Sequence, residues 1–119
     1  MPNEAQGRII EFTPEFKRNI RRLSRKYRGI RSDIEPVITD LENGETPGDQ
    51  IAGTGYTIFK IRVQNSDIRK GKRSGYRLIY YLATHEKVIL LTIYSKSDQG
   101  DISSKRLREI VIDFEENIE

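Results

Sequence analysis

Five cationic or phenolic side chains in the second half of the sequence could act together on a phosphodiester. Lys60 and Arg62 stand two residues apart in an alternating segment, so they would project from one face of a strand. Arg77 lies near the start of the next apolar segment, and Tyr94 and Lys96 lie at the end of the one after it. If these segments pair antiparallel in chain order, Arg77 lies between Arg62 and the end of the third segment. We therefore expect the five side chains to share one concave area.

A basic loop between the first two of these segments is expected to overhang the same edge of the sheet. Asp67, in this loop, and Asp98 are the nearby acids that could neutralise the cluster. Arginine binds phosphate through a planar fork and lysine acts as a compact charge, so this composition suits RNA. The expected RNA-binding residues of the loop are Arg69, Lys70, Lys72 and Arg73.

The amino acids that the chain lacks limit its chemistry. There is no cysteine and one histidine, which excludes disulfides, zinc sites built on thiolates, cysteine nucleophiles and histidine pairs. In RNA the 2′-hydroxyl can attack the adjacent phosphorus, so neither a metal nor another cofactor is needed. Well-placed donors that stabilise the developing charge are each worth about 3–4 kcal/mol. Lys60, Lys96 or Tyr94 could transfer the protons; the alternative is a site that binds phosphate without catalysis.

Charge is distributed unevenly along the chain, although the net charge is only +3. Residues 17–31 carry eight basic side chains and no acid, and residues 60–77 carry seven against one acid. Basic blocks of this density indicate a polyanionic partner, although a basic helix can also be a solvated face. Because the sequence shows no signal-peptide pattern and no apolar run of about 20 residues, we expect a cytoplasmic protein without membrane contact.

Two helices are expected ahead of the three strands. The first has Thr13 as its N-cap and a proline at its first position, presents one apolar face and ends at Gly29. Ser32 and Glu35 form the expected capping box of the second helix, with a proline near its first turn. Gly44 is the expected C-terminal stop of this helix.

Alternating or apolar runs predict strands over 7–12, 57–64, 75–83 and 88–95, and a loop over 45–55. The final helix should start near Ser103 or Ser104. His85 falls in the turn between the last two strands, far from the basic loop, so we expect no catalytic role for it. The chain is predicted to be one α+β domain over residues 1–119, in the order strand-helix-helix-strand-strand-strand-helix. We expect a small antiparallel sheet with the N-terminal helical hairpin packed on one face.

Four stretches of the sequence resemble one family of bacterial proteins. They are 59–63 (FKIRV), 69–75 (RKGKRSG), 75–81 (GYRLIYY) and 90–96 (LLTIYSK). In this order and spacing they resemble toxins of the RelE/ParE superfamily, nearest to the HigB and RelE types of mRNA interferase. The resemblance implies a RelE-like fold and a toxin of a type II toxin–antitoxin system that cleaves mRNA at the ribosomal A site.

The same resemblance implies partners and site residues. The partners would be a cognate antitoxin protein, mRNA, and the ribosome with its 16S rRNA. The functional cations of the family would be Lys60, Arg62, Arg77 and Lys96 here. RelE has a tyrosine shortly after its last strand, and residues 97–103 contain none, so Tyr94 would have to substitute for it.

Two alternatives remain open beside the ribonuclease. A ParE-like inhibitor of DNA gyrase would share the fold and act on a protein, and a non-catalytic module would only bind RNA. The dense cationic set favours the ribonuclease, because a protein-binding surface does not need it. Since Arg77 is expected at the centre of the cluster on the strand surface, Arg77→Ala should abolish toxicity and leave the fold intact.

Overall fold

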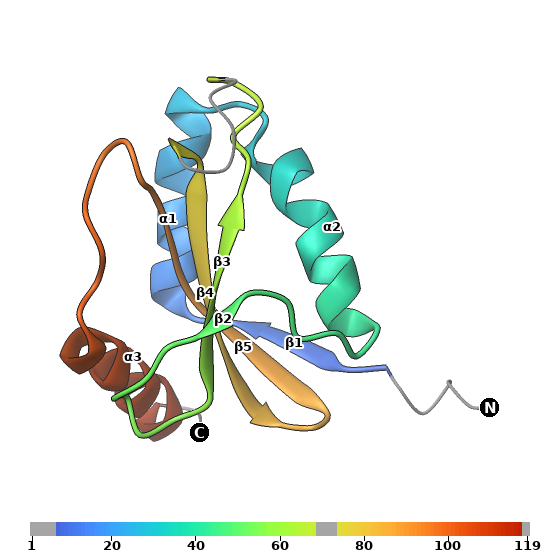
Figure 1. Ribbon diagram of the computed structural model, residues 1–119, viewed down its shortest axis with the longest axis vertical. Coiled ribbons are helices and arrows are strands. Elements are labelled where there is room, and N and C mark those ends of the chain that lie inside the picture. The colour runs from blue at the N-terminus through green and yellow to red at the C-terminus, as the bar shows by residue number, and fades with distance from the viewer. Residues whose placement is uncertain (1–6, 69–73, 118–119) are drawn as a thin grey trace.

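The computed structural model of the protein describes residues 7–68 and 74–117. Within these residues the fold is α+β, with a mixed five-stranded sheet and three helices (Figure 1). The strands are β1 (Ile9–Phe12), β2 (Asp49–Gln50), β3 (Ile58–Val63), β4 (Tyr76–Thr84) and β5 (Lys87–Ser95). The helices are α1 (Pro14–Lys26), α2 (Ile30–Glu42) and α3 (Ser104–Glu116). Each strand and helix expected from the sequence pattern is therefore present.

The strands follow the order β1-β5-β4-β3-β2 across the sheet. β3, β4 and β5 form the predicted antiparallel meander. The prediction of a wholly antiparallel sheet is wrong, because β1 pairs parallel with β5, from Ile9 opposite Lys87 to Phe12 opposite Leu90. The connection from β1 to β5 runs through helices and the other strands, so no tight turn imposes an antiparallel pairing on these two.

The helical hairpin of α1 and α2 packs on one face of the sheet, as predicted. Phe16 and Ile20 of α1 and Leu41 of α2 belong to one buried core with sheet residues such as Leu78. The hydroxyl oxygen of Thr13 accepts a hydrogen bond from the Phe16 backbone N–H at 3.0 Å, which confirms the predicted N-cap. The apolar stripe of α1 thus determines which side of this basic helix faces the sheet.

The start of α2 differs from the prediction. Its N-cap is Gly29, so Ser32 and Glu35 lie within the helix and do not form its capping box. Ile30 is fully buried and anchors the first turn in the core, which the capping pattern did not reveal. Pro36 consequently lies in the helix interior and not near the first turn. In the interior, its ring removes one backbone hydrogen-bond donor of the helix.

Glycines mark both the end of α2 and the chain reversal that follows. Gly44 has a φ of 95° directly after the C-cap, which confirms the predicted stop. The stretch 45–55, predicted to be a loop, contains the short strand β2, with Asp49 opposite Lys60. A Cβ at Gly48 would lie 2.5 Å from the Lys60 carbonyl oxygen, so glycine permits this approach. Two residues are too few to show an alternating pattern, which is why β2 was missed.

The opposite face of the sheet is partly covered by α3. Ser103 accepts a hydrogen bond from the Arg106 backbone N–H at 3.1 Å, which confirms the predicted start of this helix. Leu107 and Val111 pack with Ile79 and other sheet residues in a second core. In Figure 1, α3 lies away from the end of the sheet where β3 leads to β4. No helix in the described part of the chain is long and apolar enough to cross a membrane.

Candidate functional site

The strand register gathers the candidate residues into one group, here called the cation cluster: Lys60, Arg62, Arg77, Tyr94 and Lys96. Arg62 lies opposite Arg77, and Arg77 lies opposite Tyr94, which confirms the predicted central position of Arg77. Lys60 shares a face with Arg62, two residues away on β3. The backbone N–H of Lys96 donates to a carbonyl just before β4 at 2.9 Å, so the pairing continues past the end of β5.

Arg77 is buried, with 5% of its surface exposed, so the expectation that it lies on the strand surface is wrong. Its Nη1 donates to the carbonyl oxygens of Gly75 at 3.5 Å and Tyr76 at 3.3 Å. Deleting a buried side chain leaves unfilled space and buried polar groups without their partners. We therefore no longer expect Arg77→Ala to leave the fold intact.

The cation cluster already holds one anionic group, the carboxylate of Asp101. Its Oδ1 lies 3.1 Å from Lys96 Nζ and 3.7 Å from Lys60 Nζ, and it accepts a hydrogen bond from the Tyr94 hydroxyl at 3.4 Å. The hydrogen bond from Lys96, together with the charges of Lys60 and Lys96, lowers the pKa of Asp101. Donors from β3 and from the end of β5 therefore converge on a single anionic oxygen.

Asp101 was not identified from the sequence, which pointed to Asp67 and Asp98 as the neutralising acids. Asp67 instead accepts a hydrogen bond from the Gly29 backbone N–H at 3.0 Å, and Asp98 pairs with Lys26 at 3.0 Å. Both of these acids thus contact the helical hairpin. Asp101 follows Lys96 by five residues, and only the path of the chain towards α3 brings its carboxylate back to the cluster.

Tyr94 adds a phenol to the cation cluster. Burial raises the pKa of its phenol, and the negative charge of Asp101 acts in the same direction. A hydrogen bond from the Ile102 backbone amide and the charge of Arg77 partly oppose this rise in pKa. The phenol consequently stays protonated at neutral pH and can donate a hydrogen bond, or a proton, to an oxyanion.

Two other groups singled out in the sequence do not add to the described site. The basic loop residues Arg69, Lys70, Lys72 and Arg73 lie outside the described residues. His85 lies in the turn between β4 and β5, as predicted. It is eight residues from Arg77 along β4, roughly 26 Å of extended strand, so it belongs to the other end of the sheet.

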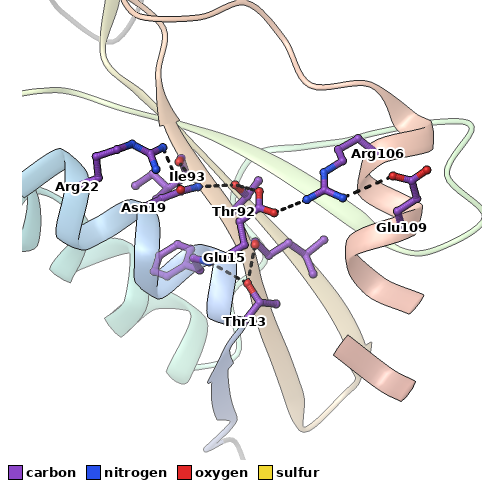
Figure 2. Close-up of polar contacts among 10 residues, drawn as sticks. Thr13, Glu15, Asn19, Arg22, Thr92, Ile93, Arg106 and Glu109 are labelled. Atoms are coloured by element: carbon purple, nitrogen blue, oxygen red, sulfur yellow. Dashed lines mark hydrogen bonds and ion pairs between the residues drawn. The ribbon is translucent and has the colours of Figure 1, made fainter. Parts of the chain in front are cut away.

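A second polar arrangement connects α1 and α3 to the outer edge of β5 (Figure 2). The Thr92 hydroxyl accepts from Asn19 Nδ2 at 3.0 Å and donates to Glu15 Oε2 at 2.9 Å. Glu15 Oε1 accepts from Arg106 Nη2 at 2.7 Å. Asn19 Nδ2 also donates to the Ile93 carbonyl oxygen at 3.1 Å. The sequence pattern does not single out these residues, because their roles depend on the placement of α1 beside β5.

A scan against models of known protein families finds no match for this chain. Across residues 7–68 and 74–117, no group of three or more His, Cys, Asp or Glu side chains is arranged to hold a metal ion. The functional interpretation therefore depends on the geometry of the cation cluster.

Proposed function

We propose that this protein is a toxin of a type II toxin–antitoxin system with a RelE-like fold, and that it cleaves mRNA without a metal. The observation that carries the proposal is the convergence of Lys60, Lys96 and Tyr94 on the carboxylate of Asp101. Carboxylate and phosphate oxygens are recognised by the same charged donors. A phosphodiester that displaced Asp101 would contact these three donors. The two arginines of the cluster, Arg62 and Arg77, lie opposite each other on the neighbouring strands β3 and β4.

The reaction that suits this site is attack of a ribose 2′-oxygen on the adjacent phosphorus. The bond between the 2′-oxygen and phosphorus forms as the bond to the 5′-oxygen breaks, which yields a 2′,3′-cyclic phosphate and a new 5′-hydroxyl. The 2′-hydroxyl proton passes to solvent, and Tyr94 donates a proton to the departing 5′-oxygen. Lys60, Lys96 and Arg62 stabilise the negative charge that develops on the phosphorane oxygens. The ribosome would supply the mRNA in its A site, and an antitoxin would hold the protein inactive.

Inducible expression in a growing bacterial culture tests the proposal, with primer extension on a reporter mRNA from the same cells. We expect growth arrest together with new 5′ ends inside translated codons. Arrest without new ends would contradict the ribonuclease and favour a gyrase inhibitor of the ParE type. Normal growth would contradict a toxin and favour a non-catalytic RNA-binding module.

Matched lysine variants test the site itself. Lys60→Ala and Lys96→Ala should each lower the cleavage rate by about 100-fold or more, because each removes a donor to the phosphorane. Lys105→Ala is the control, since it makes the same change at an exposed position of α3. Circular dichroism should show that all three variants are folded. Cleavage by the two site variants at the rate of the control would exclude this assignment.

A further inference from the structure

The exposed side of α1 is almost wholly basic. Together with the turn that follows, the helix presents seven exposed cations: Lys17, Arg18, Arg21, Arg22, Arg25, Lys26 and Arg28. Many of them are neighbours of like charge four residues apart, an arrangement that opposes helix formation. The one acid of the helix, Glu15, is engaged by Arg106 of α3. This surface therefore carries a concentrated positive charge that the acid of the helix itself does not neutralise.

One row of these cations lies at the edge of β5. Asn19 fixes the position of α1 there, because its amide donates to Thr92 and Ile93 of β5 (Figure 2). Arg22 Nη2 in turn donates to Asn19 Oδ1 at 3.0 Å, which places the guanidinium beside the same strand. Arg18 and Lys26 precede and follow Arg22 by four residues, about one helical turn each. We call Arg18, Arg22 and Lys26 the α1 row.

The α1 row reaches the cation cluster around the part of the β5 edge that β1 leaves uncovered, because α1 packs on the opposite face of the sheet. Thr92 is two residues from Tyr94 on β5, so the two share a face of the sheet. Lys26 pairs with Asp98 at 3.0 Å, and Asp98 lies two residues past Lys96 of the cluster. The segment that carries Asp98 and Asp101 thus places one carboxylate on the end of the row and another in the cluster.

We propose that a single strand of RNA passes from the cation cluster onto the α1 row, which binds the phosphates next to the reacting one. This inference rests on the proposed function. The two carboxylates of residues 98 and 101 mark consecutive anion positions along the path. At its other end the row stops at Glu15, which is paired with Arg106 of α3.

The chemistry of the row favours RNA over an acidic protein. The buried centre of a protein interface is depleted of charge and enriched in aromatic groups. The exposed large apolar side chains among the described residues are Ile9 and Ile112, and neither belongs to α1. Phosphate contacts, by contrast, need only cations at regular intervals.

Two triple variants of equal charge test the proposal. Arg18→Gln, Arg22→Gln and Lys26→Gln remove the row, whereas Lys17→Gln, Arg21→Gln and Arg28→Gln remove three cations elsewhere on the same surface. The probe is a single-stranded oligonucleotide with 2′-O-methyl riboses, which cannot react, and affinity is measured by fluorescence anisotropy across a range of salt concentrations. The row variant should bind at least about tenfold more weakly, and the slope of log affinity against log salt should fall by about 2. The control should keep nearly the wild-type slope, and equal losses in both variants would overturn the proposal.

A second comparison avoids the triple substitution, in case it weakens the helix. Asp98→Asn removes the carboxylate that competes for Lys26, so it should strengthen probe binding by about two- to fivefold. In a Lys26→Gln background the same change should have much less effect. An equal gain in both backgrounds would contradict a phosphate contact at Lys26.

The outcomes also separate this inference from the proposed function. If the wild-type protein neither binds the probe nor cuts mRNA, both fail. If it cuts mRNA and Lys60→Ala stops cleavage, but the row variant binds the probe normally, only the inference fails. Loss of antitoxin binding by the row variant, with probe affinity unchanged, would assign the row to an acidic protein and overturn the RNA path.

Discussion

Under the proposed function, Asp101 is the residue that would most directly oppose RNA binding. Its carboxylate lies among the donors that a phosphate would need, and its lowered pKa keeps it charged at neutral pH. Asp101→Asn should therefore strengthen binding of the unreactive oligonucleotide by about two- to fivefold, since it removes an internal competitor for Lys60 and Lys96. Fluorescence anisotropy at low salt measures the change.

The control for this prediction is Asp40→Asn, an identical change at an exposed position of α2, on the other side of the sheet. It alters net charge equally without touching the cation cluster, so its effect on affinity should be small. If both variants gain affinity to the same extent, net charge alone explains the result. If Asp101→Asn weakens binding, the carboxylate orders the site and does not compete with RNA.

Arg77 belongs to the cation cluster, and its side chain is also buried. Arg77→Ala should lower the free energy of unfolding by about 1–3 kcal/mol, because it leaves unfilled space in the interior and removes the guanidinium donor from the Gly75 and Tyr76 carbonyl oxygens. Arg62 faces it across the strand pair but is exposed, so Arg62→Ala should change stability by less than about 0.5 kcal/mol. Urea denaturation separates the two. Equal stability of both variants would show that the buried guanidinium contributes nothing to the fold.

At the scale of elements, one buried amide adds to the apolar core in placing α1 beside β5. Asn19 is 8% exposed, and its Nδ2 donates hydrogen bonds to Thr92 Oγ1 and to the Ile93 carbonyl oxygen. Both acceptors lie on the part of the β5 edge that β1 does not cover. Asn19→Ala should lower the free energy of unfolding by about 1–3 kcal/mol, since both acceptors lose their donor. The control, Arg21→Ala, lies on the exposed side of the same helix. A shift in the urea midpoint no larger than that of the control would contradict this role.

The pairing of β3 with β4 depends on Gly75. A Cβ at this position would lie 2.0 Å from the Val63 carbonyl oxygen, a backbone atom that cannot move without breaking the strand pair. Gly75→Ala should therefore cost about 3 kcal/mol or more, and it should also misplace Arg77. Gly100→Ala is the control, because nothing lies within 4 Å of the added atom there. Thermal unfolding followed by circular dichroism distinguishes them, and equal melting temperatures would refute the clash.

The sequence predicted those elements whose signals are local. The apolar stripe of α1, the cap at Thr13 and the alternation of β3 all depend on neighbouring residues, and so does the register that places Arg77 between Arg62 and Tyr94. The parallel pairing of β1, the existence of β2 and the role of Asp101 depend on contacts between distant segments. The start of α2 was misjudged because burial of Ile30 outweighed the capping signal at Ser32.

At the scale of the whole molecule, the two faces of the sheet carry different elements. One face is filled by α1 and α2 over the larger core, and the other carries α3 together with the cation cluster. The tyrosines of the meander belong to both cores, and burial raises the pKa of each of the following four: Tyr76, Tyr80, Tyr81 and Tyr94. We therefore expect the sheet that holds the site to lose stability in alkali.

The raised pKa values of these tyrosines determine the direction in which stability changes with pH. In the unfolded chain a tyrosine ionises near pH ~10, whereas the folded protein holds the proton more tightly. The stabilisation is thus fully present below about pH 10, and it is lost as pH rises towards the higher folded pKa values. The urea midpoint should fall steeply above about pH 10, and tyrosinate absorbance should appear together with the loss of the circular dichroism signal.

Tyr76→Phe tests the cause of this alkaline loss. The Tyr76 hydroxyl is buried and has no hydrogen-bond partner among the described residues, so its removal should cost little stability at neutral pH. The variant should lose less stability than wild type above about pH 10, because one group that ionises on unfolding is gone. If the urea midpoints of the variant and of the wild type fall equally above about pH 10, the buried tyrosines do not limit stability in alkali. Tyrosinate absorbance rising while the protein remains folded would show that the sheet admits solvent to its core.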